Sequence, residues 1–166
     1  MENEKTPLYV AFSTQKGGVG KTTFTVLAAS YLYYLKGYDV VVVDCDYPQH
    51  SIAGMRKRDA EMVGEDEDYK RMAYEQFTRL GKKAYPVLCS SPEKAIATAD
   101  EYITAAANVP DIVFFDLPGT VNSEGVINSL SGMDYIFTPI AADKVVLESS
   151  LSFAVAINKL LVRSEA

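Results

Sequence analysis

The sequence predicts an α/β fold: a doubly wound, mostly parallel sheet with helices on both faces. Strand-like and helix-like segments alternate along the 166 residues, which is the pattern of successive βαβ units. The runs 39–43 and 111–115 are apolar at almost every position, as expected for strands that are covered on both sides. A glycine-rich loop joins the first predicted strand to a long predicted helix. One domain over residues 1–166 is expected, because a chain of this length can bury a sizeable core.

The predicted elements follow one another in a steady order. The strands are expected at 8–13, 39–43, 85–89, 111–115 and 135–138. The helices are expected at 21–36, 51–63, 69–83, 91–108, 123–131 and 145–162. Gly37 and Gly132 stand where helices should stop, and Ser91-Pro92-Glu93 reads as a cap and first turn. The acidic run 64–68 predicts a surface turn or a helix start.

Composition limits the classes of function. The chain has 48% hydrophobic and 23% charged residues, which is typical of a soluble globular protein, and no apolar run long enough to insert into a membrane. Two cysteines form no disulfide framework, so we expect a reducing cytoplasm. The net charge of −6 argues against strong nucleic-acid binding by the chain as a whole. The basic residues of the two middle helices predict either a local DNA contact or ordinary solvated faces; they are Arg56, Lys57, Arg58, Arg71, Arg79, Lys82 and Lys83.

The glycine-rich loop predicts a phosphate site. It lies between an apolar strand and a helix, and its glycines let backbone N–H groups point inward at phosphate oxygens. The helix N-terminus adds the positive end of its dipole. Lys21 supplies a mobile charge for the terminal phosphates, and Thr22 supplies a hydroxyl for Mg²⁺. The candidate binding residues are Lys16, Gly17, Gly18, Val19, Gly20, Lys21, Thr22 and Thr23.

Carboxylates follow two of the predicted strands. Asp44 and Asp46 stand at the carboxyl end of the strand 39–43, and Asp116 ends the run 111–115. Ligands of open parallel sheets bind at the carboxyl ends of the strands. An apolar run that ends in a single Asp is the arrangement that holds Mg²⁺ beside a phosphate loop. These acids are therefore expected near Thr22.

The loop Lys16-Gly17-Gly18-Val19-Gly20-Lys21-Thr22 resembles the deviant Walker A box of the ParA/MinD family of P-loop ATPases. The segment 43–51 resembles the DxDPQ box of that family, although Tyr47 is inserted, and 112–119 resembles its Walker B strand. The resemblance implies binding of ATP with Mg²⁺, through Thr22, Asp44 and Asp116 as metal-site residues. It further implies that Asp46 aligns the attacking water and that Lys16 reaches the partner's ATP across a dimer. Lys16, Lys21 and Asp46 are the implied catalytic residues.

The resemblance also implies a role. We expect an ATPase that hydrolyses ATP slowly to ADP and phosphate and acts as an ATP-dependent dimerisation switch. The implied setting is partitioning of plasmid, chromosome or mobile-element DNA in a bacterial cytoplasm, at the nucleoid. The implied partners are a second copy, non-specific DNA for the full-length form, and a ParB-like activator.

Two alternatives stay open: an ATP-dependent amide-forming ligase and a MinD-like positioning ATPase. Chains of the family usually add a further strand and helix. The sequence is therefore expected to be either C-terminally truncated or a reduced member, and residues that contact adenine are not assigned.

Overall fold

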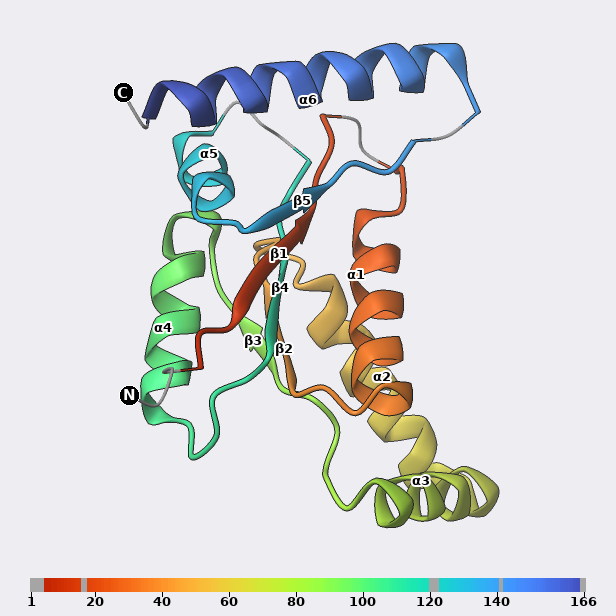
Figure 1. Ribbon diagram of the computed structural model, residues 1–166. Coiled ribbons are helices and arrows are strands. Elements are labelled where there is room, and N and C mark those ends of the chain that lie inside the picture. The colour runs from red at the N-terminus through yellow and green to blue at the C-terminus, as the bar shows by residue number, and fades with distance from the viewer. Residues whose placement is uncertain (1–4, 16–17, 120–122, 141, 165–166) are drawn as a thin grey trace.

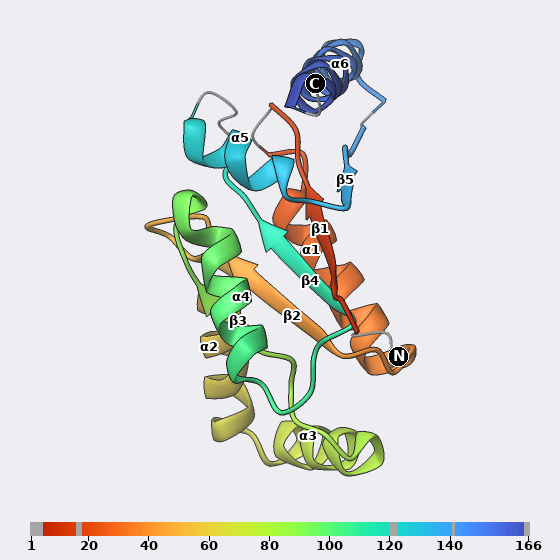
Figure 2. The same ribbon diagram turned by 60° about the vertical axis from the view of Figure 1, so that its left-hand side comes forward.

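A computed structural model describes residues 5–15, 18–119, 123–140 and 142–164 of the chain. Within them, five strands form one sheet in the order β3-β2-β4-β1-β5, and each neighbouring pair is parallel. Figure 1 shows helices on both sides of this sheet, and Figure 2 shows the sheet between them after a turn of the molecule. The predicted doubly wound fold is confirmed.

The bounds of the elements agree closely with the expected ranges. The strands are β1 (Leu8–Phe12), β2 (Val40–Asp44), β3 (Val87–Cys89), β4 (Ile112–Asp116) and β5 (Tyr135–Phe137). The helices are α1 (Lys21–Ser30), α2 (Ser51–Glu65), α3 (Glu67–Leu80), α4 (Ala95–Ala105), α5 (Glu124–Ser131) and α6 (Lys144–Ser164). A short 3₁₀ turn, η2 (Pro92–Lys94), leads into α4. The three inner strands have five residues each, and the two border strands have three.

Alternation along the inner strands divides the core into two layers. Val41, Val43 and Phe115 face the layer that contains residues of α4, α5 and α6. Val42 and Phe114 face the opposite layer, with residues of α1 and α2. Because every second side chain of a strand points to the same face, the continuous apolar runs of β2 and β4 supply both layers.

The helix expected at 21–36 changes its geometry partway along. After α1 the chain continues as a π-helical segment, η1 (Tyr31–Leu35). Its Tyr33 is buried and makes edge-on ring contacts with Tyr34 and Tyr85, with centroids 5.1 and 5.6 Å apart. The wider turn thus brings two consecutive tyrosines into contact with Tyr85, an arrangement that helical periodicity alone does not predict.

The acidic run 64–68 contains the junction between α2 and α3. Asp66 leaves the helical conformation, and its Oδ1 accepts hydrogen bonds from the N–H groups of Asp68 and Tyr69, at 2.8 and 3.1 Å. It is therefore the N-cap of α3. In Figures 1 and 2, α2 runs down beside the sheet and α3 lies below it, beyond the end at which the strands begin.

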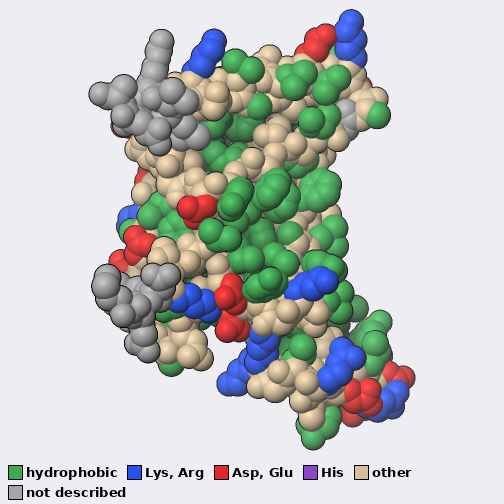
Figure 3. All heavy atoms as spheres, viewed as in Figure 1, with side chains coloured by type: hydrophobic (Ala, Val, Ile, Leu, Met, Phe, Trp, Pro, Cys, Tyr) green, Lys and Arg blue, Asp and Glu red, His purple; other side chains and the backbone are tan. Residues whose placement is uncertain are grey.

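Apolar side chains remain exposed over part of the surface. Figure 3 shows them gathered on the face that carries β5 and α1. The exposed members from these two elements are Phe24, Leu27, Tyr135 and Phe137. Helix α6 lies across the end of the sheet toward which the strands point (Figure 1), and its Phe153 and Ile157 join the core, as expected for a helix that packs on the sheet. Within the described residues, no helix combines the length and apolarity needed to cross a bilayer.

Candidate nucleotide site

The glycine loop leads from β1 into α1 with left-handed backbone at two glycines. Gly18 has φ 76° and Gly20, the N-cap of α1, has φ 89°. A side chain at either position would strain the backbone, whatever space surrounds it. Lys16 and Gly17 lie outside the described residues. Val19 lies within the loop, and Thr22 and Thr23 belong to the first turn of α1.

Lys21 is the first residue of α1 and is buried, with 9% of its surface exposed. Burial lowers the pKa of its ammonium group, and the charges of Asp116 and Asp46 oppose that effect. A cation held at a helix N-terminus is unfavourable unless anions surround it, because the dipole there is positive. The position suits a lysine whose natural counter-charge is a phosphate.

Asp116 ends β4 at the centre of the sheet, opposite Asp44 in the register of β2 and β4. Burial, together with the charges of Asp44 and Asp46, raises its pKa to about 6, although the nearby Thr22 hydroxyl and Lys21 act in the opposite direction. Among the described residues, neither oxygen of this carboxylate has a hydrogen-bond partner. A buried carboxylate in this state is costly and indicates a missing cation or donor.

Two further buried groups lack partners at the same end of the sheet. The hydroxyl oxygens of Ser13 and Thr14 are buried and make no hydrogen bond to a described residue. Both lie between β1 and the glycine loop. Together with Asp116, they form a set of unsatisfied polar atoms at the ends of β1 and β4, as expected for a site that holds a charged ligand.

Asp44 has a structural role that the sequence pattern did not reveal. It is fully buried, and its Oδ2 accepts hydrogen bonds from the N–H groups of Ile52 and Ala53, at 2.9 and 3.0 Å. These amides open α2, so the carboxylate also lies at the positive end of the α2 dipole. Its Oδ1 has two long contacts, 3.4 Å from the N–H of Asp46 and 4.0 Å from Nδ1 of His50. Because two amides occupy Oδ2, only Oδ1 is left for a metal ion, and the metal role of Asp44 stays a prediction.

Asp46 lies in the loop between β2 and α2 and is half-buried. Its Oδ2 accepts a hydrogen bond from the Ser51 hydroxyl at 3.3 Å, and its carbonyl accepts one from the N–H of His50 at 2.8 Å. The inserted Tyr47 precedes a cis peptide bond to Pro48 and is 67% exposed. The insertion therefore bulges outward and leaves Asp46 close enough to Lys21 for their charges to interact.

Three of the seven basic residues named for this region make ion pairs with carboxylates. Lys57 pairs with Glu61, Arg71 with Asp68, and Lys82 with Asp39. Exposed pairs of this kind are weak, but each places a carboxylate beside the cation. At these three positions an ordinary solvated face is the simpler interpretation, and a local DNA contact by the remaining basic residues stays a prediction.

Comparisons with known proteins show the family of the chain. The family model for the CobQ/CobB/MinD/ParA nucleotide binding domain matches residues 10–159. A curated relative, the uncharacterized protein BBD21 of Borreliella burgdorferi, is 36% identical over 85 residues, which is 50% of this chain and 34% of that protein. The chain thus aligns with about a third of that relative's length.

Solved structures share the fold. A plasmid partition protein from Borrelia burgdorferi superimposes with a TM-score of 0.66 and 20% identity, over 95% of this chain and 75% of that one. A putative plasmid partition protein from the same species (BB_S35), bound to AMPPNP, gives 0.63 and 20% identity over 94% and 72%. The family match covers the glycine loop, both acidic strand ends and the helices that carry them. The chain is therefore a member of the CobQ/CobB/MinD/ParA nucleotide-binding family, with the fold of a ParA-type P-loop protein.

Proposed function

We propose that the chain is a ParA-like ATPase that works as an ATP-dependent dimerisation switch in DNA partitioning. One observation carries the proposal: buried Lys21 and buried Asp116 flank polar atoms that lack partners among the described residues, at the mouth of a glycine loop. Such an arrangement has the charges and donors of a Mg-nucleotide site. Family membership and the fold of the plasmid partition proteins support the biological setting.

Each residue of the proposed site has a role that its position supports. Amides of the loop 16–23 and the ammonium group of Lys21 would bind the phosphates. Thr22 and Asp116 would hold Mg²⁺, with Asp44 beside them, because the oxygens of Asp116 are buried and without other described partners. Bound Mg²⁺ would neutralise charge on the transferring phosphoryl group.

Asp46 is proposed to orient the attacking water. Its carboxylate is half-buried, is held by Ser51 and lies within electrostatic reach of Lys21. A held carboxylate can position water, and phosphoryl transfer depends mainly on positioning and charge neutralisation rather than on a strong base. Slow hydrolysis is consistent with such a site, and a slow step suits a timer for a bound state.

The partners belong to the same proposal. Lys16 would reach the nucleotide of a second copy, so that ATP holds a homodimer together and hydrolysis releases it. DNA, bound without sequence preference by the full-length form, and a ParB-like activator would complete a partitioning system at the bacterial nucleoid. The net charge of −6 makes any DNA contact of this chain a local one.

Solution mass is the direct test of the switch. Light scattering is measured with Mg-ADP and with Mg-AMPPNP, and Lys21→Ala serves as the variant that should bind neither. We expect a monomer with ADP and a dimer with AMPPNP for the wild type, and a monomer throughout for the variant. An identical mass in both nucleotides contradicts the switch and favours an enzyme of fixed oligomeric state, such as an amide-forming ligase.

A further inference from the structure

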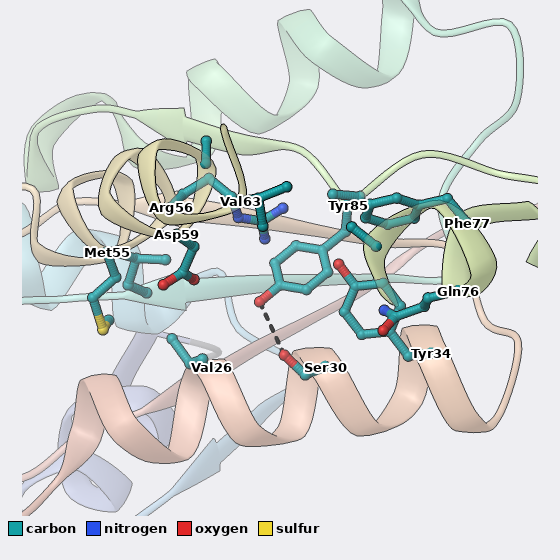
Figure 4. A pocket seen from close by; sticks show the side chains of 14 residues that line it. Val26, Ser30, Tyr34, Met55, Arg56, Asp59, Val63, Gln76, Phe77 and Tyr85 are labelled. Carbon is teal, nitrogen blue, oxygen red and sulfur yellow. Dashed lines mark hydrogen bonds between the residues drawn. The ribbon is translucent and has the colours of Figure 1, made fainter. Parts of the chain in front are cut away.

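A hollow with a volume of about 520 Å³ lies between α1, α2, α3 and the π-helical segment. This is within the usual range of small-molecule sites. Lys21, Thr22, Asp46 and Asp116 are not among its lining residues, so it is separate from the nucleotide site. Figure 4 shows side chains from the three helices pointing into it.

One wall of the hollow is aromatic. Tyr34 contacts Phe77 and Tyr85, with ring centroids 6.4 and 5.8 Å apart. Tyr85 is buried, and its hydroxyl lies 3.2 Å from that of Ser30 on α1. Figure 4 shows these three rings grouped on one side of the hollow, with Val26 and Met55 on the other. The planes of these ring pairs are tilted by 53° and 47°, so the rings form an apolar corner that a ligand's aromatic ring can contact.

Two opposite charges of α2 also line the hollow. The guanidinium of Arg56 lies over the Tyr85 ring, 4.4 Å from its centroid, which fixes its position. The Asp59 carboxylate, one turn further along α2, points into the same space in Figure 4. Among the described residues, neither group has an oppositely charged partner within 4.0 Å. The hollow thus offers a fixed donor and a nearby acceptor.

We propose that this hollow binds a purine base of the guanine type. A guanine base is flat and apolar on its faces, and it carries acceptors, O6 and N7, next to donors, N1–H and N2–H₂. Arginine pairs with O6 and N7 in the most common specific contact to guanine, and a carboxylate can accept from N1–H and N2–H₂. The Gln76 amide at the same wall supplies a further donor and acceptor.

The lining connects the hollow to the nucleotide site. Val26 and Ser30 belong to α1, the helix that Lys21 begins, and Ile52 lines the hollow while its N–H binds Asp44. A ligand that holds α1 against α2 would therefore affect the positions of Lys21 and of the loop that contains Asp46. The binding itself does not depend on the function proposed above.

Isothermal titration with guanosine, a probe that carries no phosphate, tests the proposal. The protein is first saturated with Mg-AMPPNP, so that the glycine loop is occupied. We expect guanosine to bind with a stoichiometry of one and adenosine, whose edge has a different order of donors and acceptors, to bind at least fivefold more weakly. The proposal is overturned if guanosine does not bind at concentrations up to about 1 mM. It is also overturned if guanosine binds the free protein but no longer binds when AMPPNP is present.

Matched variants of α2 locate the ligand. Arg56→Gln and Asp59→Asn should each weaken guanosine binding by roughly tenfold, the size of one lost base-edge pair. Lys57→Gln and Glu61→Gln change the same kinds of charge on the same helix, at residues that do not line the hollow, and should leave binding unchanged. Circular dichroism shows that each variant is folded. Equal weakening by both pairs would reject a specific site in the hollow.

Discussion

The burial of Asp116 determines the electrostatics of the site. Its carboxylate is 1% exposed, and its pKa of about 6 shows that the charged form is held against a desolvation cost. The nearby Thr22 hydroxyl and the charge of Lys21 offset this cost only in part, and neither carboxylate oxygen has a well-formed hydrogen bond to a described residue. The buried carboxylate thus lowers the stability of the folded chain, as expected for a group kept for a functional purpose.

We predict that Asp116→Asn stabilises the nucleotide-free protein. A pKa raised from 3.8 to about 6 means that the folded state binds more protons than the unfolded state between these values. The free energy of unfolding that is lost by burying the charged Asp116 carboxylate therefore grows as the pH rises from about 4 to about 6. Above that range the loss is constant, at about 3 kcal/mol. Urea unfolding in EDTA measures the free energy of unfolding of the variant and the wild type. The variant should exceed the wild type at pH 7 by about twice as much as at pH 5. Equal gains at both pH values contradict the predicted titration.

A second prediction at this scale concerns Asp46. Asp46→Ala should leave Mg-ATP binding intact and slow hydrolysis by roughly 100-fold, because the attacking water loses its orienting group. Phosphate release under single-turnover conditions measures the rate, and a fluorescent ATP analogue measures binding. Asp68→Ala, at an exposed acid of α3, is the control. An unchanged rate removes Asp46 from the water-positioning role.

At the scale of elements, α2 depends on a residue from a different element. Its first amides are bound by Asp44 at the end of β2, rather than by a side chain of the preceding loop. The N-cap position is His50, which has a left-handed backbone and makes no side-chain cap hydrogen bond. The buried carboxylate therefore couples the start of α2 to the centre of the sheet.

We predict that Asp44→Ala destabilises the protein more than the equivalent change at the N-cap of α3. Loss of Asp44 leaves two helix amides without their acceptor in a buried site, at a cost of roughly 2 kcal/mol or more. Asp66→Ala removes an exposed cap and should cost about 1 kcal/mol. Urea unfolding gives both values, and hydrogen exchange at Ile52 and Ala53 should rise only in the first variant. Equal losses in the two variants would falsify the coupling.

These elements show where sequence reasoning succeeds and where it stops. The glycine loop and the strands of β2 and β4 were predictable, because their signals are contiguous and each follows from local backbone chemistry. The hydrogen bond from the Ile52 N–H to the Asp44 carboxylate was not, since the two residues are eight positions apart and no capping pattern links them. The hollow of Arg56 and Asp59 was also missed, because three helices and a π-helical turn form it together.

At the scale of the whole molecule, dimerisation should depend on Lys16. We predict that Lys16→Ala keeps Mg-AMPPNP binding but stays monomeric, because the phosphate charge of each nucleotide then lacks its partner from the second copy. Light scattering and nucleotide titration are run on the same samples, with Lys57→Ala, an exposed lysine of α2, as the control. A variant that loses nucleotide binding instead places Lys16 in the site of its own chain.

The sheet ends on both sides in strands of only three residues, β3 and β5. A border strand this short offers few free N–H and C=O groups, so another chain finds little backbone to pair with. The short border strands thus disfavour edge-to-edge association of the sheets of two molecules, even though the inner strands are strongly apolar. The association of two copies proposed above would therefore rest on side chains and the nucleotide, which a cell can add and remove, rather than on paired strands.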